Sequence, residues 1–223
     1  LFEESPVQNW LGKDEVLLSL PNATLKASYL VLAGNAYLGS LGKKLSQRLM
    51  PVGTYMIATE PLGSTRAGQL LPENSAVADI NFVLDYFRLS ADQRLLFGGG
   101  VSYSTIPPVN VRSYLKKRML KVFPSLDDVE LKYGWGGLVG ITMNRMPNFG
   151  RLAPNVFLAQ GFSGHGVALT GLAGKLMAEV ISGTAERFDV MSRVPHLPFP
   201  GGPLFRMPAL LLGTTWYRLR DLL

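Results

Sequence analysis

The stretch of residues 155–183, NVFLAQGFSGHGVALTGLAGKLMAEVISG, constrains the fold more than any other part of this sequence. It predicts a short apolar strand over residues 156–159, a glycine-rich loop with one histidine, and a helix of small residues that a glycine ends. Gly161, Gly164 and Gly166 have no Cβ, so the backbone can turn sharply and approach a ligand. The unpaired N–H groups and positive dipole end of the helix favour a phosphate or a partly anionic ring at this corner. A tight corner packed by glycines is the alternative interpretation.

Composition excludes several classes of site. The chain has 223 residues, of which 47% are hydrophobic and 17% charged, as in an ordinary globular protein of one or two domains. It has no cysteine, which excludes disulfides, thiolate metal sites and covalent bonds between a cysteine and a cofactor. Its two histidines, His165 and His196, are too few for a histidine-based metal site, so no metal is expected.

The formal net charge of +6 raises the question of a nucleic-acid partner. The densest run of cations lies in residues 111–123, where apolar residues recur at helical spacing. We therefore interpret these cations as the solvated face of an amphipathic helix. No nucleic-acid motif accompanies them, so we expect no nucleic-acid partner.

The end of the sequence changes character twice. Residues 195–208 are rich in proline and glycine and predict no regular element. Residues 209–223 are apolar and predict a short helix packed on the body, with contact to a partner or a membrane surface as the less favoured alternative. No signal peptide and no apolar run of roughly 20 residues is evident, so we expect a cytoplasmic protein without a membrane span.

The remaining elements follow from periodicity and turn residues. Strands are expected over residues 1–6, 15–20, 24–33, 53–58 and 129–133, helices over 41–50 and 111–123, and a hairpin from 86–89 and 94–97. Ten of the 24 glycines fall between positions 134 and 174, which indicates a region where the backbone approaches something closely.

Three segments together resemble the FAD-dependent amine oxidoreductases of the D-amino-acid-oxidase (DAO) type, which include sarcosine and glycine oxidases. They are VLAGNA at 31–36, the run 135–152, and GFSGHG at 161–166. Three more segments resemble the gamma-glutamylputrescine oxidoreductase branch: ATEPL at 58–62, NRMP at 144–147 and PHLPFPGG at 195–202. The similarity extends over essentially all 223 residues.

One departure from the family is large. Its members open with a strand, a turn and a helix that carry G-x-G-x-x-G and bind the FAD pyrophosphate, and no such motif occurs here. We therefore expect this chain to be the C-terminal half of a longer enzyme, and to bind FAD weakly or not at all on its own. The implied fold is α+β: a partial Rossmann-like FAD domain lacking its N-terminal βαβ unit, and an antiparallel-sheet substrate domain. The expected ranges are 1–50 and 136–185 for the FAD domain, 51–135 for the substrate domain and 186–223 for a C-terminal tail.

The resemblance implies oxidation of a C–N bond in an amine or amino-acid-like substrate, as in polyamine catabolism, with gamma-glutamylputrescine as one candidate. A hydride leaves the carbon beside the nitrogen for non-covalently bound FAD, and water hydrolyses the resulting imine. Oxygen or quinone would then accept the electrons. Two other functions stay open: a membrane-peripheral dehydrogenase that docks through residues 209–223 and reduces quinone, and a non-catalytic binding domain.

The resemblance also assigns residues. Those expected at the cofactor are Val7, near the adenine, and Gly34, Asn35, Gly137, Ser163, Gly164, His165, Gly166 and Val167. His165 would have a positional role beside the flavin or, alternatively, a structural one. Substrate-facing candidates are Tyr86, Arg88, Tyr103, Trp135 and Ala168. The alternative for the three aromatic residues is an ordinary place in the hydrophobic core, and the alternative for Arg88 is an ordinary place on the surface. At the position of Ala168 sarcosine oxidases carry a lysine that meets the substrate carboxylate, so its absence favours an amine without a carboxylate at the reacting carbon.

Overall fold

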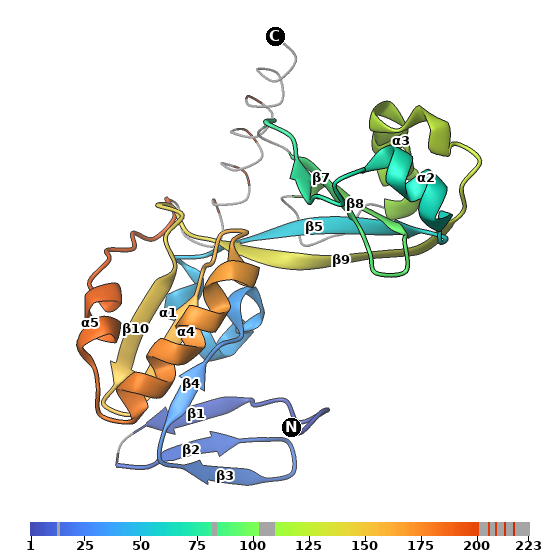
Figure 1. Ribbon diagram of the computed structural model, residues 1–223. Coiled ribbons are helices and arrows are strands. Elements are labelled where there is room, and N and C mark those ends of the chain that lie inside the picture. The colour runs from blue at the N-terminus through green and yellow to red at the C-terminus, as the bar shows by residue number, and fades with distance from the viewer. Residues whose placement is uncertain are drawn as a thin grey trace. The chain divides into compact units, whose positions relative to one another are not determined.

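The computed structural model describes residues 1–12, 14–81, 84–102 and 110–200, together with Phe205, Pro208, Leu212 and Trp216. The chain forms two compact units, and Figure 1 labels most of their helices and strands. The first unit comprises Leu1–Pro51 and Val139–Arg206, and the second comprises Val52–Leu138 and Met207–Leu223. Both contain helices and strands, which confirms the mixed α+β class.

The first unit contains two small sheets. One is an antiparallel meander of β1 (Asn9–Gly12), β2 (Val16–Ser19) and β3 (Thr24–Ala27). The other has the order β10 (Asn148–Ala153), β11 (Val156–Gln160), β4 (Leu30–Leu32). The central strand β11 runs antiparallel to β10 and parallel to β4. Strands β4 and β11 therefore both end beside the segments that carry the family motifs.

Helix α4 (Gly166–Ile181) follows β11 and packs on it through one stripe of side chains. Its buried residues Ala173, Leu176, Met177 and Val180 recur at helical spacing, and every residue of β11 is buried. Helix α5 (Glu186–Ser192) adds the fully buried Phe188 to the same core. The predicted strand and the helix before Gly183 are therefore confirmed.

The second unit is built on one five-stranded sheet. Its order is β6 (Val77–Ala78), β7 (Asp85–Leu89), β8 (Leu95–Ser102), β5 (Met50–Thr59), β9 (Leu131–Ile141). The hairpin β7–β8 and helix α3 (Val111–Val122) are found where the sequence predicts them. Helix α3 begins with a side-chain cap, because the Asn110 Oδ1 accepts a hydrogen bond from the backbone N–H of Ser113 at 2.9 Å.

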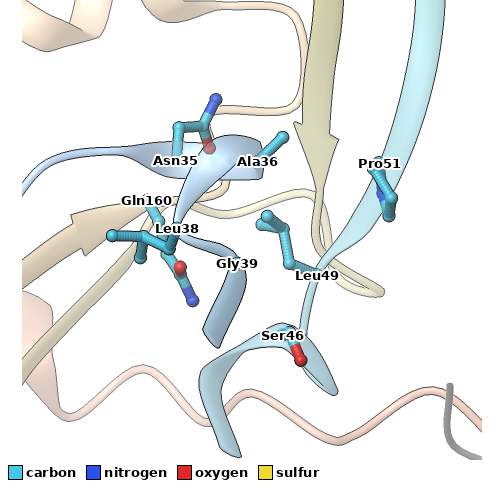
Figure 2. A pocket seen from close by; sticks show the side chains of 8 residues that line it. All are labelled: Asn35, Ala36, Leu38, Gly39, Ser46, Leu49, Pro51 and Gln160. Atoms are coloured by element: carbon cyan, nitrogen blue, oxygen red, sulfur yellow. The ribbon is translucent and has the colours of Figure 1, made fainter. Parts of the chain in front are cut away.

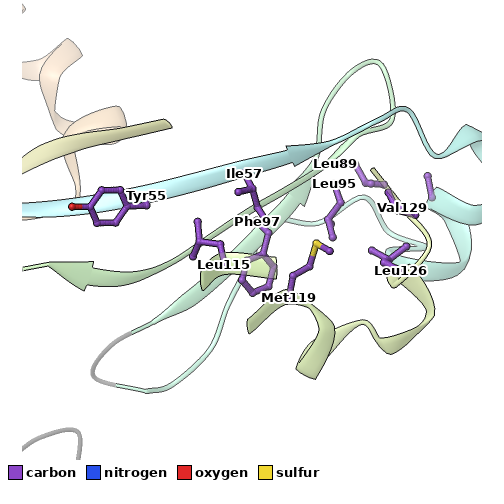
Figure 3. Packing of buried hydrophobic residues seen from close by; sticks show 10 residues of the cluster. Tyr55, Ile57, Leu89, Leu95, Phe97, Leu115, Met119, Leu126 and Val129 are labelled. Atoms are coloured by element: carbon purple, nitrogen blue, oxygen red, sulfur yellow. The ribbon is translucent and has the colours of Figure 1, made fainter. Parts of the chain in front are cut away.

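The core of this unit lies between one face of the sheet and the helices α2 (Gly63–Leu70) and α3, as Figure 3 shows. Leu115 and Met119, one turn apart on α3, meet Ile57 of β5 and Phe97 of β8, and all four side chains are fully buried. The sheet therefore presents one face to these helices, and no described helix of the unit packs on the other face.

Several predicted elements differ from those observed. The helix expected over residues 41–50 is reduced to the 3₁₀ turns η1 (Asn35–Tyr37) and η2 (Gly39–Gly42) and the single turn α1 (Lys43–Ser46). The strand expected over residues 1–6 is absent, and the one expected over 24–33 breaks into β3 and β4, which belong to different sheets. Helices α2 and α5 and strand β10 were not predicted. The C-terminal helix expected over 209–223 lies outside the described residues, apart from Leu212 and Trp216.

Candidate functional site

The corner between β11 and α4 has an unusual backbone. Gly161, Ser163 and Gly164 all have positive φ angles, of 74°, 52° and 94° respectively. Glycine adopts such angles without strain, whereas a serine there is uncommon. The sequence anticipated a sharp turn at the glycines, but not a left-handed serine between them.

The tip of this corner offers free hydrogen-bond donors. The backbone N–H of His165 donates to Phe162 O, and those of Ala168 and Leu169 donate to His165 O, which begins α4. The N–H groups of Gly164, Gly166 and Val167 have no acceptor among the residues the structure describes. His165 occupies the N-cap position, and its side chain caps none of them. Three donors and the positive end of α4 therefore face outward together.

Exposure separates the candidate residues into two groups. Gly164, His165, Val167 and Ala168 are exposed, and Val167 is fully so. Ser163 is buried, with 7% of its surface exposed. The corner is therefore not enclosed in the core of its unit, and Ser163 supports it from inside.

Two other segments hold the corner in place. The backbone N–H of Gly161 donates to the Asn35 Oδ1 at 2.9 Å, and that of Ser163 donates to Gly140 O at 3.0 Å. Asn35 itself has a positive φ of 47°. Two segments far apart in the sequence that carry family motifs, 34–36 and 161–166, therefore lie in direct contact.

A small cavity of about 40 Å³ opens beside this contact, as Figure 2 shows. Its lining residues are Asn35, Ala36, Leu38, Gly39, Ser46, Leu49, Pro51 and Gln160. The Gln160 side chain is almost fully buried, and its amide reaches Leu45 O only at 3.5 Å. Such a volume holds one or two water molecules and not a planar tricycle. The exposed corner, and not this cavity, is therefore the candidate site.

Other predicted cofactor residues are not brought to the corner by any described contact. Val7 is partly buried and packs against a separate core cluster that contains Leu18, Leu32 and Leu158. Gly34 is exposed beside Asn35. Gly137 belongs to the second unit, on strand β9.

Three of the predicted substrate residues share the face of the second unit's sheet that lies opposite α2 and α3. Phe87 and Leu89 pack in the core, so the alternate residues Tyr86 and Arg88 point to the opposite face. The Tyr86 ring lies over Gly98, where a Cβ would collide with it, and burial raises the pKa of its phenol. Tyr103 lies outside the described residues.

Trp135 reaches this face from β9. A Cβ on Gly136 would collide with the Tyr55 ring, which is part of the core, so Gly136 lies on the core side and Trp135 on the other. The indole is about half exposed. Tyr86, Arg88 and Trp135 thus face one side of a sheet, which the sequence alone could not establish for residues 50 positions apart.

Within the described ranges, the structure contains no group of three or more metal-ligating side chains. The same residues contain no helix that is both long and apolar enough to cross a membrane.

The FAD dependent oxidoreductase (DAO) family matches residues 1–180 of this sequence. The chain belongs to this family. It is 48% identical to gamma-glutamylputrescine oxidoreductase of Escherichia coli (strain K12) over 222 residues, which are 99% of this chain and 52% of that protein. It is 38% identical to the probable oxidoreductase OrdL of Haemophilus influenzae over 226 residues, again 99% of this chain and 52% of the relative. This DAO-family chain therefore spans about half the length of the curated relatives it matches.

Solved structures of DAO type share the fold. The glycine oxidase from Geobacillus kaustophilus superposes with a TM-score of 0.71 at 21% identity, covering 88% of this chain and 53% of that one. The L-proline dehydrogenase from P. horikoshii gives a TM-score of 0.64 at 20% identity, over 81% of this chain and 50% of that one. At this level of identity the likeness establishes fold alone.

Some of the residues that hold the corner in place were not predicted from the sequence. Thr142, whose backbone N–H donates to the Ser163 hydroxyl oxygen at 3.3 Å, directly follows strand β9, and no motif distinguishes it from an ordinary residue at the end of a strand. The burial of Ser163 could not be predicted either, because the motif that contains it indicates only an exposed loop.

Proposed function

We propose that this chain forms part of an FAD-dependent amine oxidoreductase in which the corner of residues 161–167 lies against the flavin. The observation that carries the proposal is the set of free N–H groups of Gly164, Gly166 and Val167 at the N-terminus of α4. These donors suit the N1 and C2 carbonyl edge of an isoalloxazine, where negative charge gathers on reduction. A helix N-terminus stabilises such charge by on the order of 0.3–1 kcal/mol when exposed and up to ~2 kcal/mol when partly buried.

The described residues fit one side of this cofactor. A Cβ placed on Gly164 would meet no atom within 4 Å, so a flat group can approach the backbone there. When bound, FAD supplies the acceptor for the hydride that leaves the substrate carbon. The protein aims the three donors, excludes water on the side it covers, and carries the aromatic and cationic residues that would contact the substrate. His165 would contribute its backbone and its position, since oxidation of a neutral amine requires no protein base.

The rest of the cofactor site would lie outside this sequence. The sequence contains no G-x-G-x-x-G segment for the pyrophosphate, so we propose a partial Rossmann-like domain that an upstream strand, turn and helix completes. Gly34, Asn35 and Val7 would serve the dinucleotide end, and Gly137 remains a proposed cofactor residue. This chain alone would then bind FAD weakly or not at all.

For the substrate we propose an amine related to gamma-glutamylputrescine, the compound named in the 48% identical relative. Tyr86 and Trp135 offer an aromatic surface, and Arg88 a cation, on the face of the sheet opposite α2 and α3. Ala168 is exposed beside the corner and offers no charge to an α-carboxylate.

The decisive experiment uses the longer protein with its upstream region. We expect it to purify with the absorbance bands of bound flavin, and anaerobic gamma-glutamylputrescine to bleach them faster than sarcosine, glycine or D-alanine. Oxygen consumption and quinone reduction, measured in parallel, identify the electron acceptor. The Ala168→Lys variant should gain turnover of sarcosine relative to the amine, because it restores a partner for the α-carboxylate. A longer protein that binds no flavin under any condition would favour the non-catalytic binding domain.

A further inference from the structure

The strained backbone of the corner is held by side chains that do not reach its tip. Ser163 adopts a left-handed conformation, with φ of 52°, between Gly161 and Gly164, which are also left-handed. A residue with a Cβ persists in this region only when its surroundings compensate for the strain. The contacts of Ser163 show what compensates.

Ser163 takes part in three hydrogen bonds that hold it in place. Its backbone N–H donates to Gly140 O at 3.0 Å, and its hydroxyl donates to Gly161 O at 3.1 Å. The same hydroxyl oxygen accepts the backbone N–H of Thr142 at 3.3 Å. The left-handed conformation therefore closes the corner back onto β11 and ties it to the end of β9.

Thr142 lies against the Ser163 hydroxyl group and is the second residue that holds the corner. Its side chain is 1% exposed, and its hydroxyl donates to Met146 O at 2.8 Å. Each hydroxyl has only one proton, so the protons of Thr142 and Ser163 are already committed, and their oxygens lie side by side at 3.4 Å. The methyl group of Thr142 fills the space that a Cβ on Gly161 would occupy.

Asn35 completes the arrangement from a third segment. Its Oδ1 accepts the N–H of Gly161 at 2.9 Å and lies where a Cβ on Gly140 would be. Gly140 and Gly161 are therefore glycines because two polar side chains use the space their Cβ atoms would fill.

We infer that Asn35, Thr142 and Ser163 are positioning residues, which together hold the corner so that the N–H groups of Gly164, Gly166 and Val167 point outward as one set. They act through the backbone, and Ser163 is a support for the cofactor site and not a contact within it. The inference rests on the proposed function for the identity of the ligand, but the support itself is a property of this chain.

Two substitutions of one residue separate positioning from simple packing. Ser163→Ala keeps the Cβ and its strain but loses both hydroxyl hydrogen bonds. Ser163→Gly loses the same bonds and removes the strain. If Ser163 acts by fixing the backbone, alanine should be the worse replacement. If it only fills space, glycine should be worse, because it removes one more buried atom.

The measurements are made on the flavin-loaded longer protein. For Ser163→Ala we expect the FAD dissociation constant to rise about tenfold, because loss of the two hydroxyl hydrogen bonds loosens the corner, and the flavin reduction potential to fall. Ser163→Gly should lie between alanine and wild type in both. Thr142→Ser, which keeps the hydroxyl, should lie closer to wild type than Thr142→Val. Wild-type values for Ser163→Ala, or a larger loss for glycine, would overturn the inference.

A second readout needs no flavin. Hydrogen exchange at the amides of Gly161 and Ser163 in this chain should be slow, since Asn35 and Gly140 accept them, and should accelerate in Ser163→Ala and Thr142→Val. Unchanged exchange in both variants would refute the support directly. If exchange accelerates in these variants but the longer protein binds no flavin, the positioning role of the three residues would stand and the proposed cofactor would be wrong.

Discussion

At the scale of single residues, buried polar atoms distinguish the two histidines of this chain. His165 is exposed at the tip of the corner, and nothing in its surroundings assigns it a proton-transfer role. His196 is partly buried, and both of its ring nitrogens are shielded from solvent. Burial lowers the pKa of His196, Arg48 adds to the effect, and the backbone of Pro147 opposes it.

This difference predicts a pH dependence of stability. In the unfolded chain, His196 has a pKa of about 6.5 and takes up a proton near that pH. In the folded chain its pKa is lower, so it stays neutral to a more acidic pH. The contribution of His196 to the free energy of unfolding is therefore fully present above about pH 6.5, and stability decreases as the pH falls below that value. We expect the thermal midpoint of His196→Gln to decline less between neutral and acidic pH than that of wild type. His165→Gln serves as the control and should follow the wild-type curve; parallel curves for His196→Gln and wild type would contradict the prediction.

At the scale of elements, the sequence predicted those whose signals are local. The hairpin β7–β8, helix α3, strand β11 and helix α4 each combine a regular apolar period with a recognisable end. The helix expected over residues 41–50 failed because Leu49 and Met50 are used in the core and at the start of β5, which leucine spacing does not reveal.

The glycine-rich part of β9 shows why other elements escaped prediction. Glycine has low strand propensity, so the strand was expected to end at residue 133, whereas it continues to Ile141. Gly134 and Gly136 fit there because Arg112 and Tyr55 cover the positions of their missing Cβ atoms. The candidate site was also predicted only in part. Its exposed tip follows from a local motif, whereas the supporting roles of Thr142 and Asn35 depend on contacts between segments far apart in the sequence.

The packing of α3 against the sheet predicts unequal roles for two ion pairs. The Arg118 Nε donates to the Asp85 Oδ1 at 2.7 Å, and their side chains are only 25% and 15% exposed. Burial lowers the pKa of Arg118, but the hydrogen bond and charge of Asp85 outweigh it. The Arg66–Asp128 pair has a similar closest distance of 2.6 Å, but its side chains are 33% and 71% exposed.

We therefore expect Asp85→Asn to lower the free energy of unfolding by about 1–3 kcal/mol, since it leaves a largely buried guanidinium with a weaker partner. The matched variant Asp128→Asn should lower the free energy of unfolding by clearly less than Asp85→Asn does, because water screens that pair. Urea unfolding of this chain, followed by circular dichroism, measures both. Equal losses would show that burial does not set the strength of these pairs.

At the scale of the whole molecule, each unit has its own core, yet the first leaves part of its longest helix uncovered. The buried stripe of α4 faces β11, whereas Gly171, Leu172 and Gly174 are exposed. A Cβ on Gly171 or Gly174 would meet no atom within 4 Å. Glycine weakens a helix, so two exposed glycines that pack against no described residue indicate close approach by a segment outside the described part of this unit. Relatives about twice as long provide such a candidate, namely the segment that would complete the cofactor domain.

The last prediction therefore compares one substitution in two molecules. In this chain, Gly174→Ala should raise the free energy of unfolding by about 0.8–1 kcal/mol, which is the difference in helix propensity. In the longer protein we expect this gain to vanish or reverse, because the added methyl group would occupy space used by the neighbouring element. Gly68→Ala on α2, where a Cβ also meets nothing, is the control and should give the same gain in both molecules. Equal gains for Gly174→Ala in both would contradict the prediction and would mean that the exposed face of α4 stays open to solvent in the longer protein.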